Sequence, residues 1–370
     1  MTDGLCKPGF ERVAEAFKKN FDRNGEVGAS VCLTVGGESV VDLWGGVADP
    51  KTGSAWSKDT VSIVFSCTKG ATAICAHVLA SRGKLDLDAP VAELWPEFAA
   101  HGKGAATVRH VLTHAAGVPG VPADITVADL CDWDKMCAAI ADAEPWWEPG
   151  TAVGYHAYTF GYILGEIVRR ATGKPISQVL LEEVTGPLGV ADELYFGMPA
   201  AEHGRLARLE DQEGAAEMMA GLPADSPMFR AGPPVTFPSA ALGNREDILE
   251  ADIPAGGKTS ARAIARMYAA LMGDVPGVRL ISPERLREVT AVTAEGIDQV
   301  FGNPATWGLG FSIGLPGAAE PVTSAFGMGG AGGSFAYGDM ASGIAFAVTK
   351  NRLTADFSAA TELIGIVTKG

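Results

Sequence analysis

A serine and a lysine stand three residues apart in the stretch FSCTKG, as Ser66 and Lys69. In a helix, residues at this spacing lie on one face, so the lysine amine could reach the serine hydroxyl. Serine needs a neighbouring base to act as a nucleophile, and a neutral lysine can supply one. The alternative is a serine helix cap followed by a solvated lysine. No other lysine and no Asp, Glu or Arg lies between Asp59 and Arg82, which indicates a buried Lys69 with a lowered pKa.

Serine chemistry of this kind also needs a proton carrier near the leaving group and backbone N–H groups that stabilise an oxyanion. Tyr155 follows a Pro-Gly turn and precedes a helix expected from about Phe160, so its phenol could point across a cleft. The alternative is a half-buried tyrosine with a hydrated hydroxyl. The run FGMGGAGGS, residues 326–334, could bring its backbone close to a ligand, or could simply form a β-bulge.

Two other motifs match known functional patterns, but the residues around them do not fit those functions. Ser312 in GFSIG matches a nucleophile elbow, but that fold needs a histidine later in the chain and the last one is His203. The stretch GGKTS, residues 256–260, lacks the first glycine of a phosphate loop and is predicted to start a helix capped by Thr259 or Ser260.

Metal and cofactor binding are also poorly supported. In HVLTH, Val111 stands where a zinc protease needs glutamate, so structural roles are expected for His110 and His114. The glycines of GMGGAGGS do not precede a helix, as a dinucleotide site would require. We therefore expect no metal and no cofactor.

The composition narrows the possible partners and location. The 370 residues carry a formal net charge of −15, which argues against binding nucleic acid or an anionic membrane. The first residues show no signal peptide, and the six scattered cysteines are typical of reduced thiols in a cytoplasmic protein. We expect a cytoplasmic protein with a small-molecule substrate, and the oligomeric state is left open.

The elements that must hold these residues come from both ends of the chain. A helix is predicted at residues 10–21, a hairpin at 28–49, β-rich runs at 307–351 and a final helix at 354–367. Between them the pattern is helical, with helices at 107–114, 131–143, 160–172 and 176–185. The prediction is an α/β (α+β) fold: an antiparallel sheet domain, residues 1–85 and 210–370, flanked by terminal helices, with an inserted all-helical domain, residues 86–209.

In this order and spacing, the motifs resemble the serine β-lactamase and penicillin-binding-protein superfamily, in particular its class C-like esterase branch, the family VIII carboxylesterases. The resemblance covers nearly the whole chain and includes FSCTKG as the S-x-x-K motif, VRHVLTHAAGV, PGTAVGYHAYTFGYILGEIV and WGLGF followed by FGMGGAGGS. It implies a β-lactamase/transpeptidase-like fold and an acyl-enzyme mechanism. Ser66 would be the nucleophile, Lys69 its base and Tyr155 the proton shuttle. The backbone N–H groups of Ser66 and Ala331 would form the oxyanion hole.

Two departures from the family pattern affect the expected substrate. Tyr-x-Asn reads Tyr155-His156-Ala157, and Met328 and Gly329 replace the Lys or His and the Thr of the third motif. Methionine cannot make a charge-assisted hydrogen bond to a substrate carboxylate, so penicillins and peptidoglycan ends should bind weakly. We expect a carboxylesterase for small esters. The alternatives are a β-lactamase, a D-amino-acid peptidase or acyltransferase, or a catalytically weak scaffold. The candidate substrate-binding residues are His156, Trp146, Met328, Gly329, Gly330 and Phe335.

Overall fold

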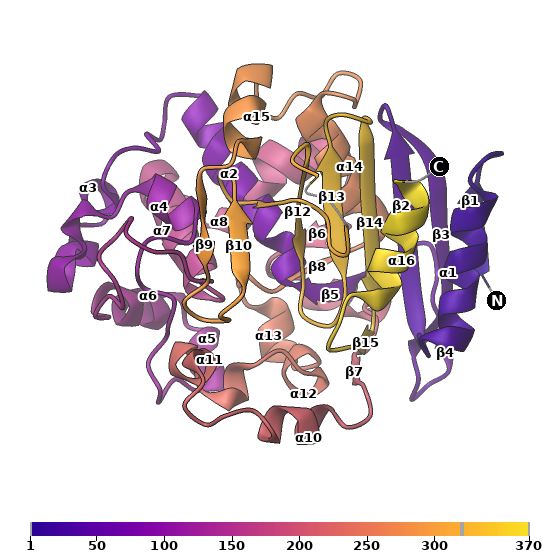
Figure 1. The fold of residues 1–370 in the computed structure, drawn as a ribbon, viewed down its shortest axis with the longest axis horizontal. Helices are drawn as coiled ribbons and strands as arrows, with labels where there is room; N and C mark the ends of the chain where they lie inside the picture. Colours follow the sequence, from indigo (N-terminus) through magenta and orange to yellow (C-terminus); the bar gives the residue numbers. More distant parts are fainter. Residues whose placement is uncertain (1, 319–321, 369–370) are drawn as a thin grey trace.

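Both ends of the chain build one large antiparallel sheet, as the sequence predicted. The structure is a computed structural model that describes residues 2–318 and 322–368. The strands follow the order β1-β3-β2-β14-β13-β12-β11-β10-β9, with β4 paired to β3 (Figure 1). The predicted hairpin forms β2 and β3, whereas the edge strand β1 was not predicted. The strands are β1 (Thr2–Cys6), β2 (Gly28–Val35), β3 (Glu38–Asp49), β4 (Ser54–Ala55), β9 (Ala294–Ile297), β10 (Pro304–Trp307), β11 (Ser312–Ile313), β12 (Ala325–Gly329), β13 (Phe335–Asp339) and β14 (Ile344–Lys350).

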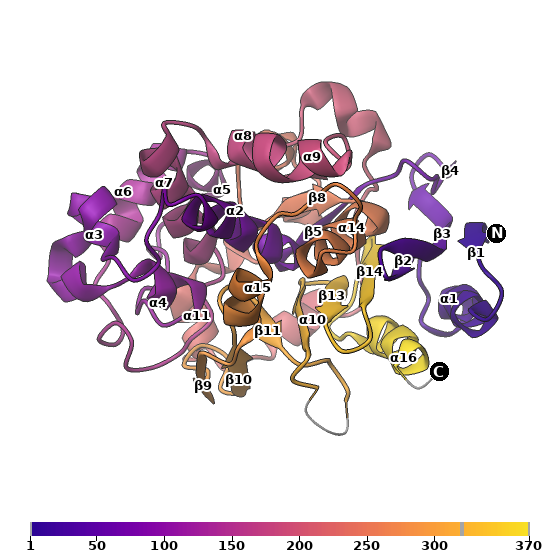
Figure 2. The same cartoon turned by 90° about the horizontal axis from the view of Figure 1, so that it is seen from above.

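The two faces of this sheet are buried by different helices. On β14, Phe346 and Val348 join the core formed with helices α1 (Glu11–Arg23) and α16 (Ser358–Val367). The alternate residues, Ala345 and Ala347, join the core that contains helix α14 (Ala261–Met272). Successive side chains of a strand point to opposite faces, so this alternation buries the strand on both sides. Figure 2 shows α1 and α16 on one side of the sheet and α14 on the other.

The middle of the chain is mostly helical and packs beside the β9 edge of the sheet (Figure 1). The four helices predicted there are confirmed as α4, α6, α7 and α8, the last continued by η3. The remaining α-helices are α2 (Lys69–Ser81), α3 (Val91–Leu94), α4 (Val108–Leu112), α5 (Val127–Leu130), α6 (Trp133–Ala141), α7 (Thr159–Thr172), α8 (Ile176–Leu180), α9 (Gly186–Leu188), α10 (Ala215–Ala220), α11 (Pro227–Ala231), α12 (Ala240–Gly243), α13 (Glu246–Glu250) and α15 (Pro283–Thr290). The 3₁₀-helices are η1 (Ser66–Thr68), η2 (Pro96–Ala105), η4 (Ala200–Arg205) and η5 (Pro234–Thr236), and η3 (Leu181–Thr185) is a π-helix.

Two small sheets connect the middle of the chain to the rest. Strands β5 (Ser62–Phe65), β8 (Gly257–Thr259) and β6 (Leu194–Tyr195) form one, and β7 (Glu210–Asp211) pairs with β15 (Arg352–Leu353) in the other. The stretch GGKTS thus contains a strand that was not predicted. The predicted cap after it is confirmed, because the Ser260 hydroxyl accepts a hydrogen bond from the N–H of Ala263 at the start of α14.

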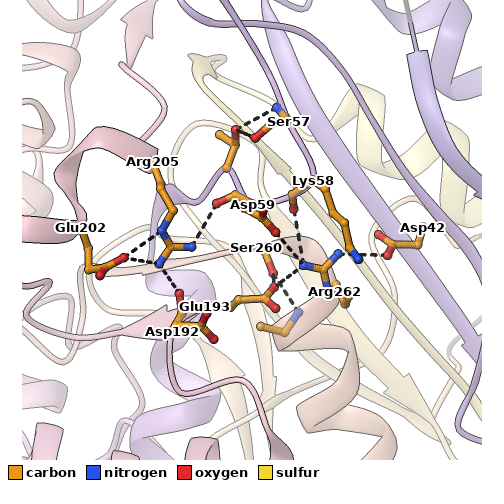
Figure 3. A network of polar contacts seen from close by, with 12 residues as sticks. Asp42, Ser57, Lys58, Asp59, Asp192, Glu193, Glu202, Arg205, Ser260 and Arg262 are labelled. Carbon is orange, nitrogen blue, oxygen red and sulfur yellow. Dashed lines mark hydrogen bonds and ion pairs between the residues drawn. The ribbon is translucent and has the colours of Figure 1, made fainter.

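An ion-pair network anchors the first turn of α14 to two distant segments. The Arg262 guanidinium donates to Asp42 of β3 at 3.2 Å and to Glu193, just before β6, at 2.9 Å. The Ser260 hydroxyl also donates to Glu193, and Arg205 donates to the carbonyl of Asp59 at 3.2 Å (Figure 3). Because Arg262 is largely buried, its ion pairs with Asp42 and Glu193 are less screened by salt than exposed pairs would be. They fix the start of α14 relative to β3 and to the segment before β6.

None of the helices in the described parts of the chain is both long and apolar enough to cross a membrane.

Candidate active site

Ser66 lies at a strained turn between a strand and a helix. Strand β5 ends at Phe65, whose φ of 45° and ψ of −127° are unusual for a non-glycine residue. The turn is held by Thr68, whose hydroxyl donates to the Phe65 carbonyl at 2.9 Å and accepts from the N–H of Gly257 at 3.0 Å. Strained backbone of this kind persists only where the surroundings enforce it, and it is concentrated at functional sites. The turn places Ser66 at the surface of an otherwise buried segment.

The Ser66 and Lys69 side chains are paired. Lys69 Nζ donates to Ser66 Oγ at 2.8 Å, and the lysine is fully buried at the first residue of α2. Burial lowers the pKa of Lys69 to about 7, since a desolvated ammonium is disfavoured. The positive end of the α2 dipole also disfavours a charge here. At neutral pH a large fraction of Lys69 is therefore a free amine within reach of the hydroxyl.

Tyr155 is brought onto this pair by the loop that precedes α7. Lys69 Nζ lies 4.7 Å from the centroid of the Tyr155 ring. Burial raises the pKa of Tyr155, and the nearby Ser66 hydroxyl lowers it in part. Tyr155 is thus protonated at neutral pH and can donate a proton next to Ser66 Oγ. Residues 66, 69 and 155, predicted together, lie together.

A close backbone contact brings the end of β12 against the Ser66 turn. A Cβ atom on Gly330 would lie 1.9 Å from the Val64 carbonyl oxygen and 3.0 Å from the Cys67 nitrogen, so only glycine fits. Ala331, the next residue, is exposed. Across the described residues, the N–H groups of Ser66 and Ala331 donate no hydrogen bond. Both are available for a substrate oxygen.

His114, which the sequence assigned only a structural role, lies directly beneath Tyr155. Its ring centroid is 4.9 Å from those of Tyr155 and Phe160 and 4.3 Å from that of Trp307. Nδ1 accepts a hydrogen bond from the His156 N–H at 3.0 Å. Burial, followed by the neighbouring His156 and Lys69, holds the pKa of His114 well below its usual value, so the ring stays neutral. These aromatic contacts hold the Tyr155 ring in place. In the sequence, only the position of His114 in the motif VRHVLTHAAGV, before Tyr155, pointed to this role.

The assignment of His156 to substrate binding is corrected by the structure. The ring is fully buried; its Nδ1 donates to the Gly154 carbonyl at 2.6 Å and its Nε2 accepts from the Val118 N–H at 3.1 Å. Both ring nitrogens are therefore occupied by backbone groups. His156 braces the loop that carries Tyr155 and offers nothing to a substrate.

Phe335 is also corrected. Its ring belongs to the core on the α1 and α16 face of the sheet, where it packs edge-on against Phe357 at 6.0 Å and beside Tyr337 at 6.3 Å. Side chains alternate along β13, and the register of this strand directs Phe335 to that core. It does not wall an acyl pocket.

The remaining candidates lie closer to Ser66. Met328 is buried in a small cluster with Val153, Trp307 and the half-buried Tyr155, so it lies at the base of the site. Gly329 and the adjoining Gly330 belong to the segment that approaches the Ser66 turn. Their contact with a substrate stays a prediction.

Trp146 lies in the loop ahead of Tyr155. Its ring is partly exposed and covered by the Arg230 guanidinium, whose central carbon is 4.0 Å from the ring centroid. This cation–π contact joins the loop to α11. Its role toward a substrate likewise stays a prediction.

Comparison with known proteins is consistent with this geometry. A family model described as Beta-lactamase matches residues 12–369. The esterase/beta-lactamase LipL of Mycobacterium tuberculosis is 36% identical over 364 residues, covering 95% of this chain and 83% of that protein. The crystal structure of a family VIII carboxylesterase superposes with a TM-score of 0.91 at 36% identity, covering 100% of this chain and 99% of the other. A penicillin-binding-protein homologue from Caulobacter crescentus gives a TM-score of 0.86 at 34% identity, covering 98% of each chain.

Proposed function

This chain belongs to the β-lactamase family and is a serine hydrolase, and from that premise we propose that it is a carboxylesterase that hydrolyses small esters through an acyl-enzyme at Ser66. The observation that carries the proposal is the 2.8 Å contact between Ser66 Oγ and a fully buried Lys69. A lysine that is about half neutral at pH 7 can accept the serine proton, whereas a solvated lysine is almost entirely charged.

In the acylation step, Lys69 Nζ takes the proton from Ser66 Oγ as that oxygen bonds to the ester carbonyl carbon. The carbonyl oxygen becomes an oxyanion, which the N–H groups of Ser66 and Ala331 stabilise. The bond between the carbonyl carbon and the alcohol oxygen then breaks. The leaving alcohol receives a proton from the Tyr155 phenol, and Tyr155 is reprotonated by Lys69. The products are the free alcohol and an ester on Ser66.

In the deacylation step, water attacks the acyl carbon and gives a proton to the Lys69 and Tyr155 pair. Ser66 Oγ leaves the carbon and takes that proton back. The net reaction consumes one ester and one water and releases one acid and one alcohol, and no other reactant is needed. The aromatic support beneath Tyr155 keeps the phenol in place through both steps.

Esters are favoured over β-lactams because Met328 stands at the position where the family has a cationic side chain. Met328 is a buried thioether beside Tyr155, and Ala157 replaces the amide of the tyrosine motif. Neither can bind a carboxylate, whereas a neutral ester needs no such anchor. The Mycobacterium tuberculosis relative is named both an esterase and a β-lactamase, which makes β-lactam hydrolysis the second candidate activity.

We also propose a cytoplasmic location. All six cysteines are free thiols, and Cys32, Cys67, Cys75 and Cys137 are buried. A chain of this size whose cysteines form no disulfide is typical of a reducing compartment, where thiols stay reduced. Cell fractionation of the producing organism tests this, and recovery in the secreted fraction would contradict it.

The experiment that tests the activity is intact-protein mass spectrometry after treatment with a fluorophosphonate, alongside assays with p-nitrophenyl butyrate and nitrocefin. We expect one adduct on Ser66, ester turnover and little nitrocefin cleavage. Ser66→Ala should lose both the adduct and the turnover. Ser62→Ala is the matched control, because the Ser62 hydroxyl donates a hydrogen bond to the Lys350 carbonyl in the core and takes no part in the site. Full turnover by Ser66→Ala would refute the proposal, and nitrocefin cleavage as fast as ester cleavage would favour the β-lactamase.

A further inference from the structure

A large aromatic side chain stands exposed beside Tyr155. Phe301, in the turn between β9 and β10, is 53% exposed, yet its ring centroid lies 5.6 Å from that of Tyr155 at an interplanar angle of 44°. We propose that Phe301 is a specificity-determining residue that contacts the alcohol part of the substrate and favours esters of aromatic alcohols. This inference rests on the proposed esterase function.

The turn that carries Phe301 is held in a defined shape. The carboxylate of Asp298, which is 3% exposed, accepts hydrogen bonds from the N–H of Val300 at 2.8 Å and of Phe301 at 2.9 Å. The Gln299 N–H donates to the Val153 carbonyl at 3.0 Å, two residues before Tyr155. The same turn is thus bonded directly to the tyrosine loop. These hydrogen bonds fix the backbone of the turn, and the Phe301 side chain on it is exposed to solvent.

Three other groups that lie near the Tyr155 ring are buried. Trp307 stacks at 6.0 Å, His114 lies at 4.9 Å and the Lys69 amine at 4.7 Å, and all three are less than a tenth exposed. Phe301 therefore covers the outer side of the tyrosine, where a substrate must approach. A ring that borders both solvent and a catalytic phenol offers an apolar surface for a bound ligand.

The part of the substrate that meets this surface follows from the chemistry. Tyr155 delivers its proton to the oxygen of the departing alcohol, so that alcohol must lie next to the phenol. A substituent on the alcohol then extends along the outer side of Tyr155, toward Phe301. An aromatic substituent gains an additional stacking interaction with this ring, whereas an ethyl group is too small to do so.

The test compares Phe301→Ala with wild type on two esters of one acid, p-nitrophenyl butyrate and ethyl butyrate. Variant-to-wild-type ratios cancel the difference in chemical reactivity between the two. The matched control is Ile297→Ala, since Ile297 lies on the same hairpin and is 56% exposed. Stopped-flow burst kinetics separate acylation, which depends on the alcohol, from deacylation of the shared butyryl-enzyme.

We expect Phe301→Ala to lower kcat/KM for the aryl ester about 2- to 10-fold, with ethyl butyrate and the deacylation rate changed less than the aryl ester. Phe301→Tyr should restore the aryl preference. An equal loss on both esters would overturn the inference, because Phe301 would then only position Tyr155. A loss in deacylation would overturn it by placing the ring on the acyl side, and so would no loss at all. Failure of the esterase proposal is recognised separately, since wild type would then hydrolyse neither ester.

Discussion

The low pKa of Lys69 predicts how the activity depends on pH. Burial lowers this pKa from 10.5 to about 7. At pH 7 about half of the Lys69 amines are then neutral, against about one in 3,000 for a solvated lysine. If the neutral amine is the base, kcat/KM rises with pH, with a midpoint of about 7, and falls about tenfold per pH unit below it. Because burial also raises the pKa of Tyr155, its phenol stays protonated and the plateau extends through about pH 9.

The assay is kcat/KM for p-nitrophenyl butyrate between pH 5 and pH 9 at constant ionic strength. Lys69→Arg should be inactive throughout, because a guanidinium stays charged. Lys258→Met is the matched control: Lys258 is also fully buried with a pKa lowered to about 7, but its amine donates to the carbonyls of Phe196 and Ile248. Circular dichroism checks that this variant folds, and its pH profile should match that of wild type.

Two results would refute this reasoning. A rate that does not change between pH 5 and pH 9 would show that no group with a pKa near 7 is needed for acylation. A rate that is low at pH 8 and still rising at pH 9 would identify the Tyr155 phenolate as the base in place of the Lys69 amine, since the pKa of Tyr155 is raised.

Two further predictions concern the packing around the site. Gly330→Ala places a Cβ atom 1.9 Å from the Val64 carbonyl oxygen and must displace the Ala331 N–H, so kcat/KM should fall by about 100-fold. The control is Gly104→Ala, whose Cβ would meet nothing nearer than 3.7 Å. An unchanged kcat/KM in Gly330→Ala would contradict the proposed oxyanion hole. Lys69→Met should stabilise the fold most at low pH. The unfolded chain binds the lysine proton up to pH 10.5 and the native protein only to about pH 7, so wild type gains stability between these values as pH rises. Urea denaturation should show the advantage of Lys69→Met shrinking by about 4 kcal/mol between pH 6 and pH 10, and an equal advantage at both pH values would argue against a buried, titrating lysine.

Much of the fold could be predicted because its signals are local. The helical spacing, the Gly-Gly hairpin and the glycine-separated β runs identified the longer helices, the central strands and the antiparallel sheet that both chain ends share. Short strands such as β1, β6 and β8 escaped prediction, because a strand of two to five residues is stabilised by its partner and carries little pattern of its own.

The substrate candidates show where a sequence pattern is insufficient. Phe335 and Met328 lie on adjacent paired strands near the same glycine-rich turn, yet Phe335 faces the terminal helices and Met328 faces the cluster beside Tyr155. A shift of one residue in register would exchange the faces of a strand, and register depends on partners far along the chain. His156 is adjacent to Tyr155, but its ring is directed inward by bonds to Gly154 and Val118.

The sequence by itself determined the pairing of Ser66 with Lys69, because two residues three positions apart in a helical turn lie on the same face. Only the tertiary structure decided that this lysine is desolvated, because its burial depends on segments that are distant in sequence. The same holds for Gly330 against Val64, and for Phe301 beside Tyr155, contacts that join residues more than 140 positions apart. Proximity along the chain creates the nucleophile and its base, whereas their pKa values, their oxyanion donors and their substrate preference depend on long-range packing.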